Sequence, residues 1–429
     1  MDGGDDKMAD HDDLLASIIY AGLDSLGAIE ASGITTTGFQ AKHNVSVLRG
    51  FMASLGKPDL PISYGLEEYD PNDPDPERLE LINTRLKMML STDPNTEWQR
   101  WHQVDTDIRG SEVRNLEPID HKTAFSRFYD KLEREKRDGK IVVTTGAQTI
   151  HSIMNDPELG PRFRQFTKKI ILQSGAKTGP DGRKYPDGDA RNAFYHITAS
   201  EDLFKQAQDY EILTDIYTKF AATACAIEPP FVSELAETGH KGAQFLHEIS
   251  NSVDAIQLFD TLNDGRLFTK KFTLDLLMKF KTVLDDERAS EVKQELLSRW
   301  SQQDKSKMSK EEYTEYLSDY LSLMQQVTKN VPYDSEAMLG ALDDEYLEAL
   351  NILKKPVVDD GGTGTKHTFR VIGSPTDCGV NVSEMRDTII ALAGYTILNT
   401  LEGSYMPPSE RPASILTGAQ ATRSVPTTL

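Results

Sequence analysis

The residues with the clearest chemical potential lie at the start of the chain, where six aspartates fall within the first thirteen positions. An apolar run, residues 14–19, follows directly after Asp12 and Asp13. Carboxylates this close together repel one another unless a positive charge lies among them, and Ca²⁺ and Mg²⁺ both prefer oxygen ligands. The pattern therefore favours a divalent-cation site in front of a helix. The alternative is an acidic, solvated terminus that binds nothing.

Composition and charge narrow the classes of partner. The chain has 429 residues, of which 38% are apolar, and a formal net charge of −21. This length fits one large α/β domain with an insertion as well as it fits two domains. An acidic surface repels phosphate backbones, so we expect no nucleic-acid partner, whereas a nucleoside without phosphate stays possible as a ligand.

The cysteines and the hydropathy pattern bear on location. Cys225 and Cys378 are the two cysteines, which is too few for a disulfide scaffold and favours a reducing compartment. No segment approaches the roughly 18 apolar residues of a membrane span, so we expect no membrane partner. The acidic N-terminus is unlike a signal peptide, which predicts a cytoplasmic protein. Secretion into a host cell without a cleaved signal is the alternative.

Apolar patterns of two kinds alternate along the first half of the chain. Helical spacing is found at 14–26 and 44–54, and buried-strand runs are found at 140–145 and 169–175. Residues 28–37 and 369–372 also have strand character. This alternation predicts an α/β fold with a doubly wound, mostly parallel sheet and helices on both faces.

The later chain changes character and sets the expected domain boundaries. We expect an α/β core over 1–261, a helical insertion over 262–330, a return to the core over 331–403 and a disordered tail over 404–429. Within the core, the Gly/Pro/Asp-rich segment 178–189 is predicted to be a loop, and 233–246 a single helix.

Other candidate sites carry less signal. His151, His196, His240 and His247 are scattered singly, so each is interpreted as a satisfied polar residue rather than a zinc ligand. The glycine-rich segment 361–365 lacks the Lys-Ser/Thr pair of a phosphate-binding loop and is interpreted as a turn.

Three segments together resemble the inosine–uridine nucleoside hydrolase family, which includes hydrolase-like effectors of plant pathogens. The aspartate cluster is similar to the family's Asp-led signature before the first helix. Gly33-Ile34-Thr35-Thr36 followed by Asn44 is similar to its second strand and Asn-led helix. Segment 144–149 (Thr-Thr-Gly-Ala-Gln-Thr) is similar to its strand-end Thr-Gly-Ala-Leu-Thr-Asn. The resemblance covers roughly residues 2–255 and, less closely, 331–400.

The resemblance implies a Ca²⁺ ion, with Mg²⁺ as the alternative, at the carboxyl ends of the parallel strands. A water bound to the metal would attack the anomeric carbon of a ribonucleoside, breaking the N-glycosidic bond. By resemblance, Asp2 would act as base and ligand, and Asp6, or Asp13 in another register, as a further ligand. The Thr145 carbonyl and Asp334 would complete the metal site.

The resemblance also assigns residues to the ribosyl ligand. Asp5 and Asn44 would hold ribose hydroxyls, and Tyr195 and Tyr333 occupy positions where the family contacts ribose and the leaving base. At these positions the family has the Asn of Glu-Phe-Asn and the His of His-Asp. Because tyrosine is a poor acid near neutral pH, protonation of the base would be impaired.

Two functions therefore follow from the sequence. The first is a nucleoside hydrolase-like enzyme that cleaves a ribonucleoside or related ribosyl ligand with a divalent cation. The second is a catalytically weak effector or ligand-binding protein that keeps the fold. The expected partners are a nucleoside or other ribosyl small molecule, with a homo-oligomer or a host protein as further candidates.

Overall fold

The structure is a computed structural model that describes residues 11–37, 41–66, 76, 79–80, 118–262, 274–302, 328–354 and 368–401. The N-terminal segment with Asp2, Asp5 and Asp6 lies outside these ranges, as does the tail predicted over 404–429.

Two parallel sheets form the framework of the fold. The larger one has the order β4-β5-β8-β9, and the smaller one has the order β1-β2-β3. The strands are β1 (Ile34–Thr36), β2 (Ile62–Tyr64), β3 (Ile119–Asp120), β4 (Gly139–Val143), β5 (Thr167–Gln173), β8 (Leu213–Tyr217) and β9 (Phe369–Ile372). The predicted parallel α/β class is therefore confirmed.

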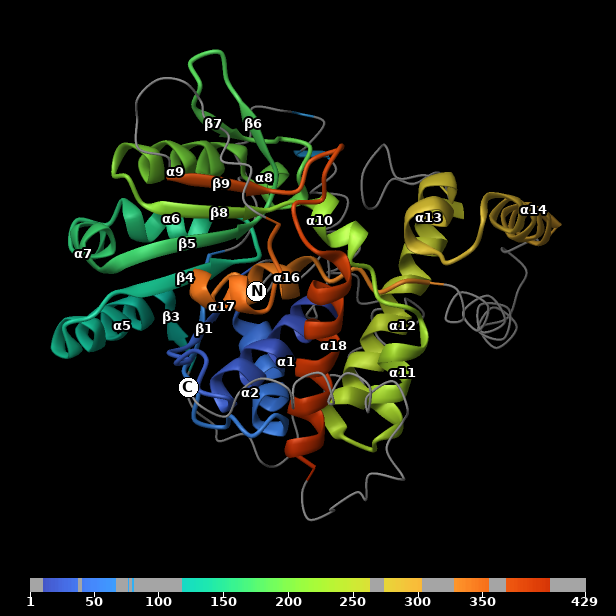
Figure 1. Ribbon diagram of the computed structural model, residues 1–429, viewed down its shortest axis with the longest axis horizontal. Coiled ribbons are helices and arrows are strands. Elements are labelled where there is room, and N and C mark those ends of the chain that lie inside the picture. The colour runs from blue at the N-terminus through green and yellow to red at the C-terminus, as the bar shows by residue number, and fades with distance from the viewer. Residues whose placement is uncertain are drawn as a thin grey trace.

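Both faces of the larger sheet are covered by helices because successive side chains of a strand point to opposite faces. Ile170 and Leu172 of β5 belong to a core built with α5 (His121–Glu135), α6 (Gln148–Met154), α7 (Leu159–Phe166) and α9 (Ile197–Asp209). Ile171, between them, belongs to the core on the other face, with α1 (His11–Ser25), α2 (Ala41–Ser54), α16 (Tyr333–Leu339) and α18 (Val382–Asn399). Figure 1 shows α1, α16 and α18 below this sheet.

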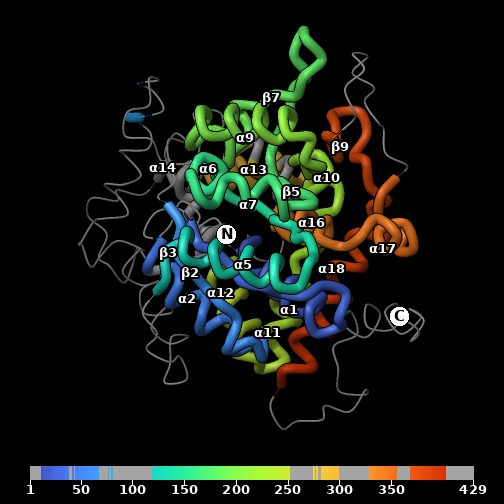
Figure 2. The backbone as a smooth tube through the Cα atoms, turned by 90° about the vertical axis from the view of Figure 1, so that its left-hand side faces the viewer, coloured from blue at the N-terminus to red at the C-terminus, as the bar shows by residue number. Residues whose placement is uncertain are grey.

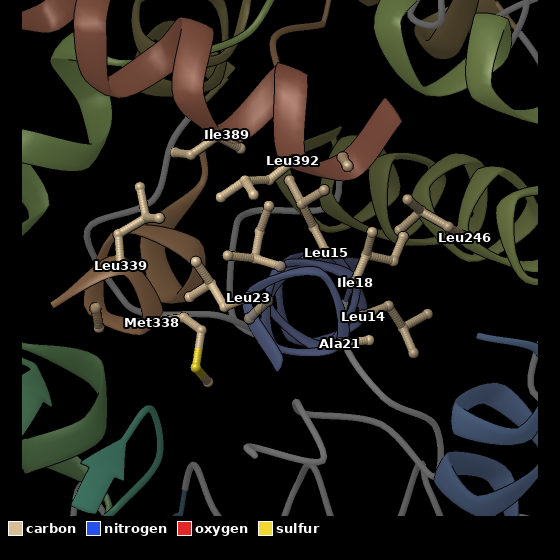
Figure 3. Packing of buried hydrophobic residues seen from close by; sticks show 14 of the residues in the cluster. Leu14, Leu15, Ile18, Ala21, Leu23, Leu246, Met338, Leu339, Ile389 and Leu392 are labelled. Atoms are coloured by element: carbon tan, nitrogen blue, oxygen red, sulfur yellow. The ribbon is translucent and has the colours of Figure 1, made fainter. Parts of the chain in front are cut away.

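Helix α1 is the centre of the second core. Leu14, Ile18 and Ile19 are each 0% exposed, and neighbouring helices surround α1 with Leu246, Met338 and Leu392 (Figure 3). Close approach of α18 requires Gly22, since a Cβ there would lie 2.4 Å from the Thr396 hydroxyl. That hydroxyl donates a hydrogen bond to the Ile18 carbonyl at 3.1 Å. The predicted helix at 14–26 is confirmed and begins at His11.

Two segments differ from the sequence prediction. Residues 178–189 contain part of a hairpin, β6 (Ala176–Thr178) and β7 (Lys184–Pro186), turned by Gly179-Pro180-Asp181-Gly182 with Gly182 at φ +78°. The two strands have only three residues each, too few to give a strand pattern in a segment dominated by turn residues. The hairpin stands out from the body of the molecule (Figure 2), and the Gln208 side chain on α9 bonds to both backbone groups of Lys184.

The second difference is a helix break. The segment 233–246 is divided between α11 (Pro230–Glu237) and α12 (Lys241–Leu262), with Gly239 at φ +77° between them. A left-handed glycine ends a helix at little steric cost, so the break follows from this residue.

The described part of the predicted insertion is helical. It contains α13 (Leu274–Lys281) and α14 (Asp286–Gln302), which lie away from both sheets in Figure 1. The boundaries at 262 and 330 stay a prediction. Three short helices complete the described chain: α8 (Arg191–Phe194), α10 (Lys219–Ala224) and α17 (Asp344–Ala349). Among the residues placed in the structure, no helix is long and apolar enough to cross a membrane.

Candidate functional site

Polar residues gather where parallel strands of both sheets end. Because ligands of open α/β sheets bind outside the carboxyl ends of strands, these residues form the candidate site. We name them the strand-end cluster: Thr37 after β1, Asn44 on α2, Thr144 and Thr145 after β4, Gln148 and Thr149 on α6, Gln173 at the end of β5, and Asn192 on α8.

The smaller sheet joins the cluster through Thr149. Its hydroxyl accepts a hydrogen bond from the Leu66 amide at 3.0 Å. At Gly65, just after β2, a Cβ would lie 2.3 Å from the Thr149 Oγ1 and 2.9 Å from the Thr37 methyl carbon. The Asn44 Nδ2 donates to the Thr37 carbonyl at 3.3 Å. The ends of β1 and β2 therefore meet the first turn of α6.

The larger sheet joins the cluster through Asn192. Its side-chain amide lies 2.9 Å from the Thr144 carbonyl, 3.0 Å from the Gln173 carbonyl and 2.8 Å from the Gln173 Oε1. These contacts tie the ends of β4 and β5 to α8. A single asparagine thereby occupies backbone acceptors that parallel strands leave open at their ends.

Gln148 lies in the loop-to-helix junction between these two halves. It is 5% exposed, and neither its Oε1 nor its Nε2 has a hydrogen-bond partner among the described residues. Its side chain folds back over Gly146, where a Cβ would lie 2.5 Å from the Oε1. Gln148 belongs to the segment 144–149 that resembles the family, but the sequence analysis assigned no role to it, because the family has leucine at that position of the motif.

Two of the predicted metal ligands are buried carboxylates. Asp13 in the first turn of α1 is 0% exposed, and Asp334 in the first turn of α16 is 4% exposed. Helices α1 and α16 pack against each other along the second core. Both carboxylates have interaction partners in the structure, and carboxylate oxygens are ligands that Ca²⁺ and Mg²⁺ accept.

The other predicted ligands are placed only in part. Asp2, Asp5 and Asp6 lie outside the described residues. Within the part of the chain that the structure places, no group of three or more His, Cys, Asp or Glu residues is arranged to hold a metal. A complete cation site would therefore need donors beyond these residues or backbone carbonyls.

The remaining predicted residues lie at the same end of the fold or in the core. Thr145 is buried, and its hydroxyl donates to the Gly146 carbonyl at 2.9 Å. Tyr195 is 1% exposed and packs edge-on against the Phe194 ring, with centroids 5.9 Å apart. Tyr333 is the half-buried first residue of α16, directly before Asp334.

Each of the four histidines named in the sequence analysis has a partner in the structure. The His240 Nε2 donates to the Ser54 carbonyl at 2.9 Å, while its Nδ1 accepts from the Ala243 amide and caps α12. The His196 Nδ1 caps α9 in the same way. The His151 Nε2 lies 3.0 Å from Asp202. His247, the fourth, lies 3.3 Å from the Asn251 side chain. These contacts agree with the interpretation of satisfied polar residues.

A second buried acid follows Asp334 on the same helix. Glu336 is 0% exposed, and its two carboxyl oxygens lack hydrogen-bond partners among the described residues apart from contact with the Cys225 thiol. Burial raises the pKa of Glu336 to about 8, an effect that the Cys225 contact partly offsets. The group therefore holds its proton near neutral pH.

These features define a three-layer α/β protein in which polar residues converge at the carboxyl ends of the parallel strands. The sequence matches no protein-family model and none of the curated proteins. Solved structures do match, and the likeness is therefore one of fold.

Two of the solved structures that match are described as effector proteins. One is described as type III effector protein XopQ complexed with adenosine diphosphate ribose, with a TM-score of 0.66, 18% identity and 92% of each chain covered. Another is the effector protein XOO4466, with a TM-score of 0.65, 17% identity and 91% of each chain covered. The chain shares the α/β fold of these proteins.

A purine-preferring ribonucleoside hydrolase from Gardnerella vaginalis also aligns. Its TM-score is 0.45 at 15% identity, with 90% of this chain and 96% of that chain covered. This weaker likeness lies below the level at which two folds are treated as the same.

Proposed function

We propose that this protein binds a ribosyl small molecule, such as ADP-ribose, at the strand-end cluster. The observation that carries the proposal is the convergence of Thr149, Asn192 and Gln148 at the carboxyl ends of strands from both sheets. The shared fold with XopQ, whose structure is described as an ADP-ribose complex, supports this class of ligand. Ribose hydroxyls and phosphate oxygens suit such a polar edge.

We further propose that a divalent cation, Ca²⁺ or Mg²⁺, takes part in binding. Asp13 and Asp334 would contribute carboxylate oxygens, because buried carboxylates are stabilised by a cation. The Thr145 carbonyl, Asp2 and Asp6 are the further donors that the sequence resemblance implies. When bound, the cation would lower the pKa of a coordinated water.

Hydrolysis of the N-glycosidic bond is the second candidate, favoured by the two buried carboxylates Asp13 and Asp334. One carboxylate would take a proton from the attacking water as the base leaves. Tyr333, beside Asp334, would be the donor to the leaving base, and a tyrosine phenol is a weak acid for that step near neutral pH. We therefore rank ligand binding above turnover.

Calorimetric titration of the full chain with ADP-ribose tests the proposal, in Ca²⁺ and again in EDTA. We expect saturable binding that weakens in EDTA and a melting temperature that rises with ligand concentration. Release of free base from inosine, uridine and ADP-ribose, followed by chromatography, tests the second candidate. Absence of any heat or thermal shift with ADP-ribose, adenosine and inosine would contradict the binding function.

A further inference from the structure

We propose that Gln148 contacts the ribosyl ligand directly and sets the specificity of the site for ligand hydroxyls. This inference rests on the proposed ribosyl-binding function and adds a residue to it. A buried carboxamide without partners lowers stability, because water that once solvated it has been removed and nothing replaces it. Gln148 is such a group: it is 5% exposed, and both amide atoms lack partners within the described chain.

Several polar groups of the strand-end cluster hold hydrogen bonds with one another or with the adjacent backbone. The Thr149 hydroxyl receives the Leu66 amide, the Thr145 hydroxyl donates to the Gly146 carbonyl, and the Asn192 amide reaches three acceptors. None of these contacts involves Gln148. Within the described chain, the donor and acceptor of Gln148 therefore stay unused, next to Thr149, whose hydroxyl contacts the segment after β2.

The position has room for a folded-back side chain. Gly146 faces the Gln148 carboxamide, and any side chain at 146 would collide with its Oε1, at 2.5 Å from a Cβ. A glycine at this place allows Gln148 to lie over the loop that follows β4 instead of extending away from it. The carboxamide is held beside the strand ends, where the proposed ligand would lie.

The chemistry of a carboxamide defines the ligand group that it recognises. Its oxygen accepts one or two hydrogen bonds, while its nitrogen donates two. A sugar hydroxyl both donates and accepts, so a ribosyl hydroxyl can satisfy either amide atom. Binding would thereby remove a cost that the free protein carries, and this stabilisation would favour ligands that keep the hydroxyl.

A substitution that keeps the shape and removes the amide tests the inference. In Gln148→Met, the unbranched side chain fills a similar volume, and the unmatched polar atoms disappear. We expect the free variant to melt at the same temperature as the wild type or higher. We also expect its dissociation constant for ADP-ribose, measured by calorimetry, to rise about tenfold, as loss of a buried ligand hydrogen bond predicts.

A matched control separates this role from a structural one. Gln208 is another partly buried glutamine, but its amide bonds to the backbone of Lys184 and to the Phe204 carbonyl. Gln208→Met should therefore melt at a lower temperature and bind ADP-ribose as the wild type does. Gln148→Leu serves as a second variant of Gln148 with the same expected signs.

Two outcomes would overturn the assignment of Gln148 while the wild type still binds ADP-ribose. One is affinity of Gln148→Met within twofold of the wild type. The other is a lower melting temperature of the free variant, which would show that the amide is satisfied inside the protein. If the wild type itself binds no ADP-ribose, adenosine or inosine, the proposed function and this inference fail together.

Discussion

At the scale of single residues, Glu336 combines complete burial with an ionisable group. The Cys225 thiol contacts the Glu336 carboxyl group. The pKa of the nearby Tyr217 phenol is raised first by burial, then by the negative charge of Asp215, and to a smaller extent by that of Glu336. No cation is among the influences on the Glu336 pKa within the described residues. The neutral acid is thus the form that the fold accepts.

The raised pKa of Glu336 makes stability depend on pH. The unfolded chain releases this proton near pH 4.5, whereas the folded protein keeps it until about pH 8. The free energy of unfolding should therefore fall as the pH rises from about 4.5 to about 8, and this contribution should level off above that value. Urea denaturation of Glu336→Gln across this range should show a smaller fall than the wild type.

Glu345→Gln, at an exposed position on α17, provides the control and should leave the pH dependence unchanged. An equal slope in Glu336→Gln and the wild type would mean that Glu336 is ionised in the folded protein.

Residues of the candidate site differ in whether the sequence alone could point to them. Asp13, Asn44, Thr145 and Asp334 were predicted as site residues from the resemblance of their segments to the nucleoside hydrolase family. The sequence assigned no role to Gln148. What distinguishes this residue is that its side-chain amide has no partner within the described chain, which a sequence does not show. Only three-dimensional packing shows which amides are satisfied.

At the scale of elements, a charge network fastens α17 to the larger sheet. The Lys169 Nζ on β5 lies 2.6 Å from Asp215 on β8, and the Arg370 Nε on β9 donates to the same carboxylate at 2.7 Å. Arg370 also reaches Asp344 in the first turn of α17, at 3.0 Å. The Lys169 and Asp215 side chains are 7% and 5% exposed, so their charges are weakly solvated.

Removal of one partner from this network should be costly. In Asp215→Leu, buried Lys169 loses its close counter-charge, and we expect the free energy of unfolding to fall by about 3–5 kcal/mol. The double variant Lys169→Met/Asp215→Leu should recover part of this loss, because the buried positive charge is then absent. Guanidinium denaturation measures both.

The exposed pair Arg288–Glu291, at 2.7 Å on α14, supplies the comparison. Glu291→Ala should change the free energy of unfolding by no more than about 1 kcal/mol. A similarly small loss in Asp215→Leu would contradict a buried role for the network.

Long apolar runs made β4 and β5 predictable, since parallel strands covered on both faces carry few polar residues. The hairpin β6-β7 could not be predicted, because its strands are short and border a turn of Gly, Pro and Asp. Likewise, the helical pattern of 233–246 continued through Gly239, and only the backbone shows the break.

At the scale of the whole molecule, strand β5 contributes fully buried side chains to both hydrophobic cores. It pairs with β4 on one side and β8 on the other, with Ile170 and Ile171 each 0% exposed on opposite faces. Its amides can exchange with solvent only when both cores open. Local opening elsewhere, as in the projecting hairpin β6-β7, leaves it protected.

Hydrogen–deuterium exchange of the folded protein should therefore show β5 as the slowest segment among the described strands. We expect peptides that cover Thr167–Gln173 to exchange at least about tenfold more slowly than those that cover Lys184–Pro186, because global opening costs more than local opening. Mass spectrometry after proteolysis measures the rates. Faster exchange in β5 than in β9 would mean that the two cores open independently.

The surroundings of α1 also constrain how the protein is made. Its partners α16 and α18 begin more than 300 positions later in the sequence. The ribosome therefore synthesises this apolar helix long before α16 and α18, so the face of α1 that packs on these two helices stays exposed during most of synthesis. Nascent chains of this protein should depend on chaperones until α18 has emerged from the exit tunnel.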